Sequence, residues 1–202
     1  RGGGVPLAGV AGGVPREGGG YRVNGQGGSR TAWTWVRAAG VWSARLLEPL
    51  GVKVSLEAER GYHLIFKDPG VTLTNSIMDA DNKFVTSSME MGVRSAGTAE
   101  FAGIDAAPNY QRAKVFAKYT KALLPNLNTE PTEEWMGRRP SPPDSVPYIG
   151  EVPGYPRLFH GFGHGHLGLT GAPMTGRMLA ALASAEPLNV DMTPYRIDRF
   201  GG

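Results

Sequence analysis

A glycine-rich connection between a strand-like run and a helix-like run places the strongest constraint on what this chain can fold into. The connection contains Gly163, Gly165, Gly168 and Gly171, and it follows the apolar run 158–162. Glycine lets the backbone approach a ligand closely, and a following helix directs its unpaired N–H groups and positive dipole end at that point. Two interpretations stand: a site for an anion or an electron-rich ring edge, or a tight connection that binds nothing.

Histidines gather around the same connection. His164 and His166 are two residues apart, which in an extended segment puts both side chains on one face and could make a metal site, and His160 lies just before them. No carboxylate lies within the turn, so a polar rim around an organic ligand is preferred and a metalloprotein is the alternative. Tyr62 and His63 open another strand-like run and could line a pocket, although a core aromatic is the commoner explanation.

Two adjacent arginines make a second candidate. Arg138 and Arg139 are followed by Pro140, which fixes the chain, and a guanidinium held on a short strand can grip a carboxylate with two parallel hydrogen bonds. The residues alone favour the other interpretation, in which both arginines are solvated and balance the charges of Glu133 and Glu134.

The charge is concentrated near the N-terminus. The chain of 202 residues has a net charge of +3, and residues 1–50 hold six arginines against two glutamates. Residues 1–28 also contain 12 glycines, so this segment buries too little apolar surface to offset its ordering entropy and we expect loop or disorder. The basic residues are not interleaved with aromatic side chains that could stack on bases, so we expect no nucleic-acid partner.

Composition excludes several classes of protein. The chain has no cysteine, so disulfide scaffolds, thiolate metal sites and cysteine nucleophiles are excluded. No stretch approaches the ~18 unbroken apolar residues of a membrane-spanning helix, and no signal-peptide core is present. We expect a cytoplasmic location, with peripheral association at the inner face of the plasma membrane left open.

Hydrophobic periodicity predicts a mixed α and β fold from about residue 33. Residues 52–103 form short apolar runs at the roughly 8–12-residue spacing of an antiparallel sheet, with a hairpin turn at Asp81-Asn82. Residues 125–156 contain eight prolines and allow only brief strands. The other predicted elements are a strand over 33–39, a helix over 41–50, a helix over 109–124, a strand over 158–162 and a helix from about Pro173 to Ser184.

The N-terminal glycines do not make a dinucleotide fingerprint. That fingerprint needs Gly-x-Gly-x-x-Gly after a strand and before a helix. Residues 25–30 read Gly-Gln-Gly-Gly-Ser-Arg, so the third glycine is missing, and no strand is predicted before them.

Several separate runs, in unbroken order from about residue 38 to residue 200, resemble one family. The runs are residues 38–43 (AAGVWS), 60–64 (RGYHL), 92–101 (GVRSAGTAEF), 137–140 (GRRP), 143–150 (PDSVPYIG), 163–170 (GHGHLGLT) and 198–200 (DRF). Together they resemble the C-terminal two-thirds of FAD-dependent amine oxidoreductases. The later runs resemble the D-amino-acid dehydrogenase branch of the D-amino-acid oxidase superfamily.

The resemblance implies an enzyme that oxidises the Cα–N bond of an amino acid by hydride transfer to FAD. The imino acid then hydrolyses to a 2-oxo acid and ammonia, and oxygen or a quinone accepts the electrons. Arg139 would grip the substrate carboxylate, with Tyr62 and His63 beside the substrate. The residues that would bind the cofactor are Ala39, Gly40, Trp42, Gly163, His164, Gly165, His166, Leu167, Gly168 and Thr170. No metal and no catalytic side chain are predicted.

The resemblance also implies an α+β (α/β) fold that lacks the N-terminal dinucleotide-binding unit. The expected parts are a glycine-rich segment over 1–35 that is disordered or non-native, an FAD-binding part over 36–51, an antiparallel-sheet substrate part over 52–135 and a C-terminal FAD-binding part over 136–202. We therefore expect the C-terminal fragment of a protein of roughly twice this length. A glycine or sarcosine oxidase and a silent fragment that binds no FAD alone are the alternatives.

Overall fold

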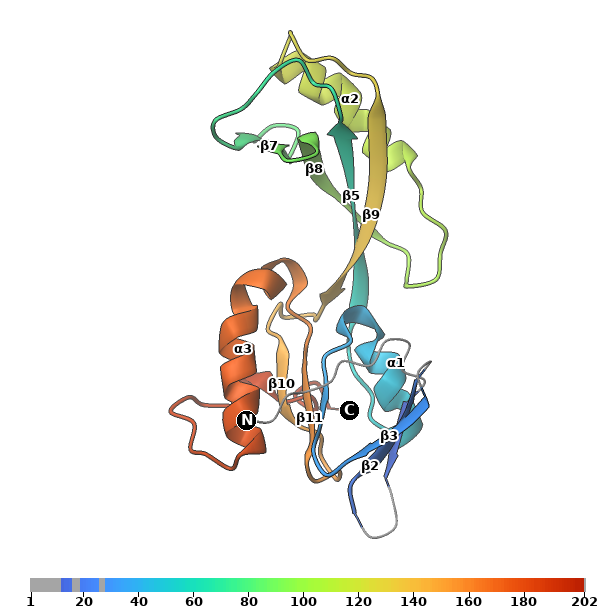
Figure 1. Cartoon of the computed structure of the whole chain (residues 1–202), viewed down its shortest axis with the longest axis vertical. Helices are drawn as coiled ribbons and strands as arrows, with labels where there is room; N and C mark the ends of the chain where they lie inside the picture. The colour runs from blue at the N-terminus through green and yellow to red at the C-terminus, as the bar shows by residue number, and fades with distance from the viewer. Residues whose placement is uncertain (1–11, 16–18, 26–27, 202) are drawn as a thin grey trace. The chain divides into compact units, whose positions relative to one another are not determined.

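The chain divides into two compact units (Figure 1). The computed structural model describes residues 12–15, 19–25 and 28–201. The split unit comprises the chain up to Glu57 together with the chain from Pro140 onwards, and the central unit is Ala58–Arg139. All the predicted cofactor residues lie in the split unit, and all the predicted substrate residues lie in the central unit.

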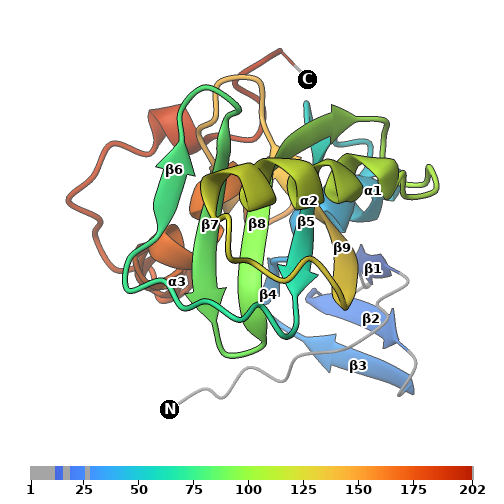
Figure 2. The same ribbon diagram turned by 90° about the horizontal axis from the view of Figure 1, so that it is seen from above.

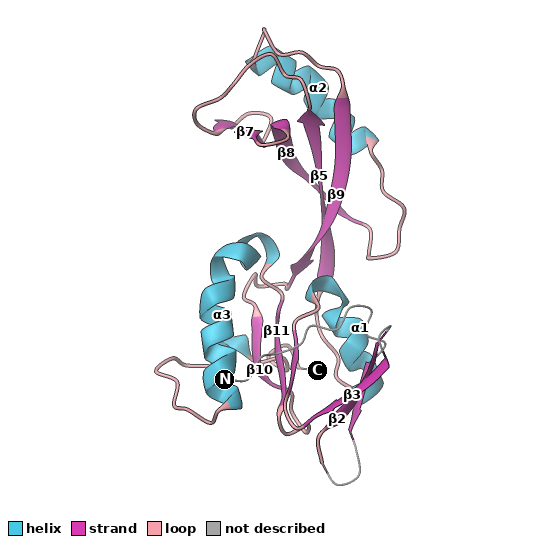
Figure 3. Cartoon of the chain, viewed as in Figure 1, coloured by secondary structure: helices cyan, strands magenta, loops and turns pink. Residues whose placement is uncertain are grey.

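The split unit holds two three-stranded sheets (Figure 3). One is an antiparallel meander of β1, β2 and β3, and the other has the order β10-β11-β4. In the second sheet β11 runs antiparallel to β10 and parallel to β4. The strand bounds are β1 (Gly12–Pro15), β2 (Tyr21–Gly25), β3 (Gly28–Ala32), β4 (Trp35–Arg37), β10 (Tyr148–Glu151) and β11 (Leu158–Phe162).

For the described residues within 1–28, the meander differs from the expected loop or disorder. Residues 12–15 and 21–25 are strands, and they pair with each other and with β3. Tyr21 and Val23 are buried, so two apolar side chains at period two give this glycine-rich segment one inward face. Residues 1–11, 16–18 and 26–27 lie outside the described part of the chain.

The helices of the split unit are α1 (Ser43–Leu47) and α3 (Gly168–Ala183). The predicted start of the last helix at Pro173 is wrong. A 3₁₀ turn over Gly165–Leu167 runs directly into α3, so most of the glycine-rich connection is itself helical. No helix in the described ranges has the length and apolar character needed to cross a bilayer.

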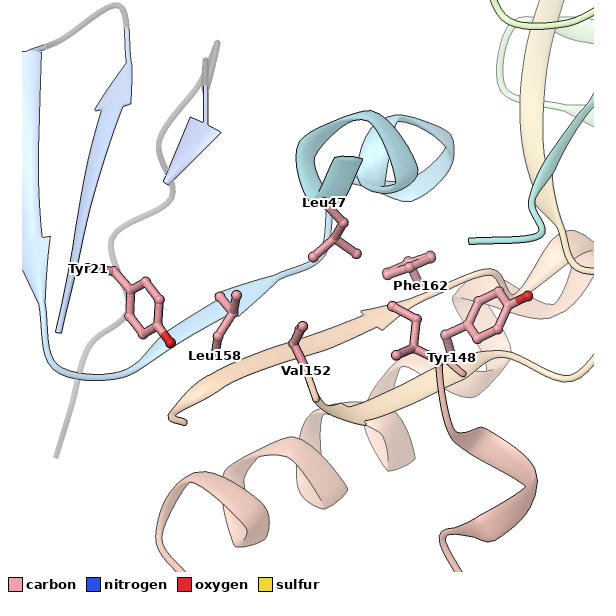
Figure 4. Close-up of a cluster of buried hydrophobic side chains, with 7 residues drawn as sticks. Tyr21, Leu47, Tyr148, Val152, Leu158 and Phe162 are labelled. Carbon is pink, nitrogen blue, oxygen red and sulfur yellow. The ribbon is translucent and has the colours of Figure 1, made fainter. Parts of the chain in front are cut away.

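The main core of the split unit collects side chains from both of its sheets and from α1 (Figure 4). Leu158 and Phe162 alternate inward along β11, while Phe159 points to the other side and packs with Met178 of α3. The buried tyrosines bond to backbone carbonyls, so their hydroxyls are satisfied: Tyr21 donates to Pro156 at 2.8 Å. The cluster consists of Tyr21, Leu47, Tyr148, Val152, Leu158, Phe162 and Ile197.

The central unit is one antiparallel sheet with a helix on one face (Figure 2). The strand order is β6-β7-β8-β5-β9, and the helix is α2 (Gln111–Leu123). The predicted antiparallel sheet and the predicted hairpin at Asp81-Asn82, which joins β6 to β7, are confirmed. The strand bounds are β5 (Glu57–Phe66), β6 (Ile77–Asp79), β7 (Phe84–Met89), β8 (Gly92–Phe101) and β9 (Thr132–Ser141).

The two faces of this sheet differ in character. The face under α2 is apolar, with Leu64, Phe66, Phe84 and Val93 packed against Phe116 of the helix. The opposite face carries no helix of the central unit. This opposite face, the open face, presents the alternate residues of β5 and β9, and it carries the chemistry described next.

Candidate functional site

The glycine-rich connection adopts a backbone that side chains disfavour. Gly163 and Gly165 have φ of +85° and +52°. A Cβ on Gly163 would lie 3.0 Å from Pro142 and 3.1 Å from the Tyr148 ring. The residue that precedes α3, Leu167, makes no side-chain cap, so no side chain closes the N-terminal end of the helix.

His164 fastens the connection to the helix that follows it. Its Nε2 lies 2.8 Å from the Thr175 hydroxyl, two turns into α3, and burial lowers the pKa of its imidazole. His166 and Leu167 are exposed, and Leu169 is 92% exposed. Within the described ranges, no three histidine, aspartate or glutamate side chains come together as they would around a metal ion.

The segment after β4 lies at the same edge of the sheet as this connection. β4 and β11 run parallel, with Arg37 opposite His160, so their carboxyl ends meet at one edge. Ala39 and Gly40 follow β4 there, and ligands of open α/β sheets bind outside such ends. The structure thus brings together the two predicted cofactor segments, which are far apart in the sequence.

These segments fit a flat, partly apolar cofactor such as FAD. Gly40 has φ +57°, and a Cβ there would meet nothing within 4 Å, so the backbone is open at this point. Trp42 is 50% exposed beside it. Ser43 is fully buried, and its hydroxyl has no hydrogen-bond partner within the described chain.

Arg139 lies on the open face of the central unit, flat against Gly61. A Cβ at Gly61 would collide with the guanidinium, so only glycine leaves this space. The Arg139 Nη1 lies 3.5 Å from the Glu59 carboxylate, and 29% of the arginine side chain is exposed. The arginine is therefore held in place by packing while part of its side chain remains accessible.

The alternative in which both arginines balance the charges of Glu133 and Glu134 is wrong. Those carboxylates pair with lysines, Glu133 with Lys67 at 2.7 Å and Glu134 with Lys114 at 3.7 Å. Arg138 instead donates from Nε to the Ile104 carbonyl at 2.7 Å.

His63 shares the open face with Arg139. Its ring stacks on Trp135, with centroids 4.8 Å apart, and its Nδ1 accepts a hydrogen bond from Arg94 Nε at 3.1 Å. Burial, with a contribution from the Arg94 charge, lowers the pKa of His63 to about 4, and Glu133 partly opposes the shift. His63 is therefore neutral near pH 7 and carries its proton on Nε2.

Tyr62 faces the other way, towards α2. It is 1% exposed, and its hydroxyl donates to Glu100 at 2.5 Å and accepts from the Asn109 N–H at 3.0 Å. The structure therefore brings His63 and Arg139 to one face and gives Tyr62 a place in the packing under the helix. Trp135 and Arg94 were not predicted from the sequence. The two-residue period of a strand, which puts residues 135, 137 and 139 on one face, is a signal that could have identified Trp135.

Lowering the pH from 7 to 4 is expected to destabilise the fold through His63. Its folded pKa of about 4 lies below the ordinary 6.5, so between these values the unfolded chain binds a proton that the folded chain does not. The stability is complete above about pH 6.5 and falls towards pH 4, by at most about 1.4 kcal/mol per pH unit for one proton. His160 has the same shift, so urea unfolding of the native chain and of His63→Gln isolates the His63 part. An unchanged slope in the variant would contradict this.

Comparisons with known proteins identify the family of the chain. The family described as FAD dependent oxidoreductase matches residues 3–182, so the glycine-rich N-terminal segment belongs to the match rather than standing outside it. D-amino-acid oxidase of Bradyrhizobium diazoefficiens is 38% identical over 169 residues, which are 82% of this chain and 40% of that protein. D-amino acid dehydrogenase of Paramagnetospirillum magneticum is 37% identical over 86% of this chain and 42% of that protein.

Further relatives give the same picture. Glycine oxidase of Pseudomonas aeruginosa is 32% identical over 78% of this chain and 43% of that protein. The solved structure of glycine oxidase from Geobacillus kaustophilus matches the fold with a TM-score of 0.75 at 24% identity, covering 91% of this chain and 50% of that one. The chain thus spans about half or less of the length of these proteins. It belongs to the FAD-dependent oxidoreductase family, whose members related to this chain are amino-acid oxidoreductases.

Proposed function

We propose that this chain carries the substrate-carboxylate site and part of the cofactor site of an FAD-dependent enzyme that oxidises the Cα–N bond of a D-amino acid. The observation that supports this most directly is the placement of Arg139. The guanidinium is seated on Gly61, 29% of the side chain is exposed, and Nη1 lies 3.5 Å from the Glu59 carboxylate, a distance at which a substrate carboxylate can compete.

On the open face, Arg139 binds and orients the substrate. A carboxylate that accepts two parallel hydrogen bonds from the guanidinium is fixed in direction as well as position. The bound substrate then presents its Cα–H in one direction, so the energy of carboxylate binding offsets the entropy lost when the reacting bond is oriented. Arg94 adds a second positive charge to the same face. Burial lowers the pKa of the Arg94 guanidinium, and the nearby Arg139 charge acts in the same direction.

His63 is a donor and a stacking surface rather than a base. Its Nδ1 accepts from Arg94, so its remaining nitrogen carries hydrogen and cannot take a proton from the substrate. We infer that the amino group enters already neutral, and that the product imino acid hydrolyses in water to a 2-oxo acid and ammonia.

In the split unit, the glycine-rich connection and the segment at Ala39 and Gly40 hold the cofactor. Bound FAD supplies the acceptor for the hydride from Cα. The first N–H groups of α3 and the positive end of its dipole favour an electron-rich ring edge at the connection. His164 keeps the connection closed on α3 through Thr175, and exposed Trp42 offers an apolar surface for a ring.

A glycine or sarcosine oxidase is the second candidate, supported by the relative named glycine oxidase. Arg139 serves a carboxylate in either case, so the amine part of the substrate distinguishes them. Oxygen and a quinone both remain as electron acceptors, and a quinone would fit peripheral association with a membrane.

The test is flavin retention and substrate preference of the purified chain. With FAD added, we expect flavin absorbance to elute with the protein and dye reduction to be faster with D-alanine or D-proline than with their L enantiomers or sarcosine. Gly163→Val is expected to lose the flavin, because its side chain would strain a φ of +85° and meet Pro142.

Gly154→Val is the matched control. Gly154 is also left-handed, at +78°, but a Cβ there meets nothing within 4 Å, so this variant is expected to retain flavin. A native chain that folds but retains no flavin would support the silent-fragment alternative. Faster turnover of sarcosine would support the second candidate.

A further inference from the structure

Arg94 carries a positive charge on the open face that the described part of the chain does not neutralise. Its Cα lies opposite Ile65 in the pairing of β8 with β5, and its side chain is half-buried. Within the described ranges it has no ion pair with a carboxylate, whereas Arg139 on the same face has Glu59 at 3.5 Å. A half-buried cation without an anion is costly, because burial removes hydration that nothing replaces.

Most of the hydrogen-bonding capacity of Arg94 is also unused. Its Nε donates to His63 Nδ1 at 3.1 Å. Its two Nη nitrogens have no hydrogen-bond partner among the residues that the structure describes, and neither of them is fully buried. A guanidinium carries most of its donors on these two nitrogens, in a planar fork that matches a carboxylate. The fork of Arg94 is therefore both unpaired and accessible.

The anchor of this arginine is held in place on the sheet. The His63 ring stacks on Trp135, with centroids 4.8 Å apart, and the Trp135 ring itself lies over Gly137, where a Cβ would collide with it. Because His63 is neutral and accepts from Arg94, it fixes the direction of the arginine without neutralising its charge. A ligand that neutralises Arg94 must therefore supply the negative charge.

The two arginines of the open face present their charges at separate points of one strand. β5 lies between β8 and β9, and Arg94 reaches across from β8 to His63 while the Arg139 guanidinium lies on Gly61. Gly61 and His63 are two residues apart on β5, which is about 7 Å along a strand. A single carboxylate in a parallel grip on Arg139 leaves Arg94 unmatched, whereas a molecule with two carboxylates offers one to each arginine.

We propose that Arg94 binds a second carboxylate of the substrate, so that the amino acid oxidised at this site has an acidic side chain, as D-glutamate and D-aspartate do. The assignment rests on the proposed function, in which Arg139 binds the α-carboxylate. An uncharged side chain would leave Arg94 half-buried without an anion, and a basic one would add a third positive charge beside two arginines. Arg94 is thus the residue that determines the charge of the substrate side chain.

D-Glutamate and D-glutamine test the proposal, because they have the same length and differ in the charge of the side chain. Titration calorimetry of the native chain with no FAD added measures binding without turnover. D-Glutamate is expected to bind about tenfold or more tightly than D-glutamine, as one charge-assisted hydrogen bond provides. In the ¹⁵N-labelled chain, the Arg94 Nε signal, identified by its absence from Arg94→Gln, is expected to shift more with D-glutamate.

Three variants connect the preference to the guanidinium. Arg94→Gln keeps an amide donor and removes the charge, so its affinities for D-glutamate and D-glutamine are expected to become equal. Arg94→Lys keeps the charge without the planar fork and is expected to retain part of the preference. Arg138→Gln is the matched control, because Arg138 donates to the Ile104 carbonyl and follows the opposite face of β9; it is expected to keep the full preference.

Absent binding of D-glutamate, or equal affinity of the native chain for the two amino acids, overturns the proposal. An undiminished preference in Arg94→Gln also overturns it. Equal native affinities that both fall in Arg94→Gln would place Arg94 on the α-carboxylate instead.

Dye reduction with FAD present separates this proposal from the proposed function. Oxidation of D-alanine by a chain that shows no preference for D-glutamate overturns the acidic side chain and leaves the enzyme class intact. A preference for D-glutamate in calorimetry, with no amino acid oxidised, overturns the enzyme class and supports the role of Arg94 in binding an acidic ligand.

Discussion

Replacing Arg139 by leucine is expected to raise the KM for the amino-acid substrate by about thirty- to a hundredfold, or more. The physical reason is the loss of a charge-assisted, bidentate grip on the carboxylate, which corresponds to roughly 2–3 kcal/mol. Steady-state dye reduction with FAD present measures the change. Leucine fills the space beside Gly61 without a charge, so the fold is expected to persist.

Arg138→Leu is the matched control, since it makes the same substitution one position earlier. Arg138 donates to the Ile104 carbonyl, and the residues on either side of it along a strand face the opposite way. Its loss is expected to lower stability and to leave KM within about twofold. Similar KM values for the native chain and Arg139→Leu would contradict the role of Arg139 in binding the carboxylate. Equal increases in KM for the two variants would show that the positive charge of the region matters and that the position of Arg139 does not.

Replacing Arg60 by methionine is expected to be among the most damaging single changes in the central unit, at about 3 kcal/mol or more of unfolding free energy. Arg60 is completely buried, and its Nη2 donates to the Ala107 carbonyl at 2.7 Å. Its Nε lies 3.3 Å from the Glu100 carboxylate, which is itself only 13% exposed. Removing the guanidinium takes one of two cations from a largely buried carboxylate and leaves the Ala107 carbonyl without its donor.

Arg112→Met provides the comparison, because Arg112 pairs with the same carboxylate at 3.0 Å but is 42% exposed. An ion pair that reaches solvent contributes about 0–1 kcal/mol, so this variant is expected to be nearly neutral. Urea unfolding of both variants measures the difference. Equal losses would show that burial does not distinguish the two arginines, and Arg60→Met combined with Glu100→Leu should recover part of the loss.

The antiparallel sheet of the central unit could be predicted because alternation and turn residues are local signals. Asp79 shows why the hairpin was predictable: its carboxylate accepts the N–H groups of Asp81 and Asn82, an interaction set by neighbours in sequence. The meander could not be predicted, because its glycine-rich strands acquire stability from partners that only the fold supplies. Tyr21, for example, bonds to Pro156, 135 residues away.

The candidate sites divide in the same way. The closely spaced glycines of the connection at Gly163 could be recognised in the sequence, and the family resemblance identified Arg139. The stacking of His63 on Trp135 and the hydrogen bond from Arg94 join three strands, so no local pattern contains them. The opposite orientation of Tyr62 follows from the period of a strand, once the buried face is known.

Gly61 has a consequence for how variation in this protein would be observed. Its Cα serves as the floor under the Arg139 guanidinium, and any side chain there must displace the far end of a flexible arginine rather than break a rigid core. Substitutions at residue 61 should therefore be silent in screens for folding or expression and visible only in substrate affinity. Mutations at a glycine would then have the same effect as mutations of a residue that binds the substrate.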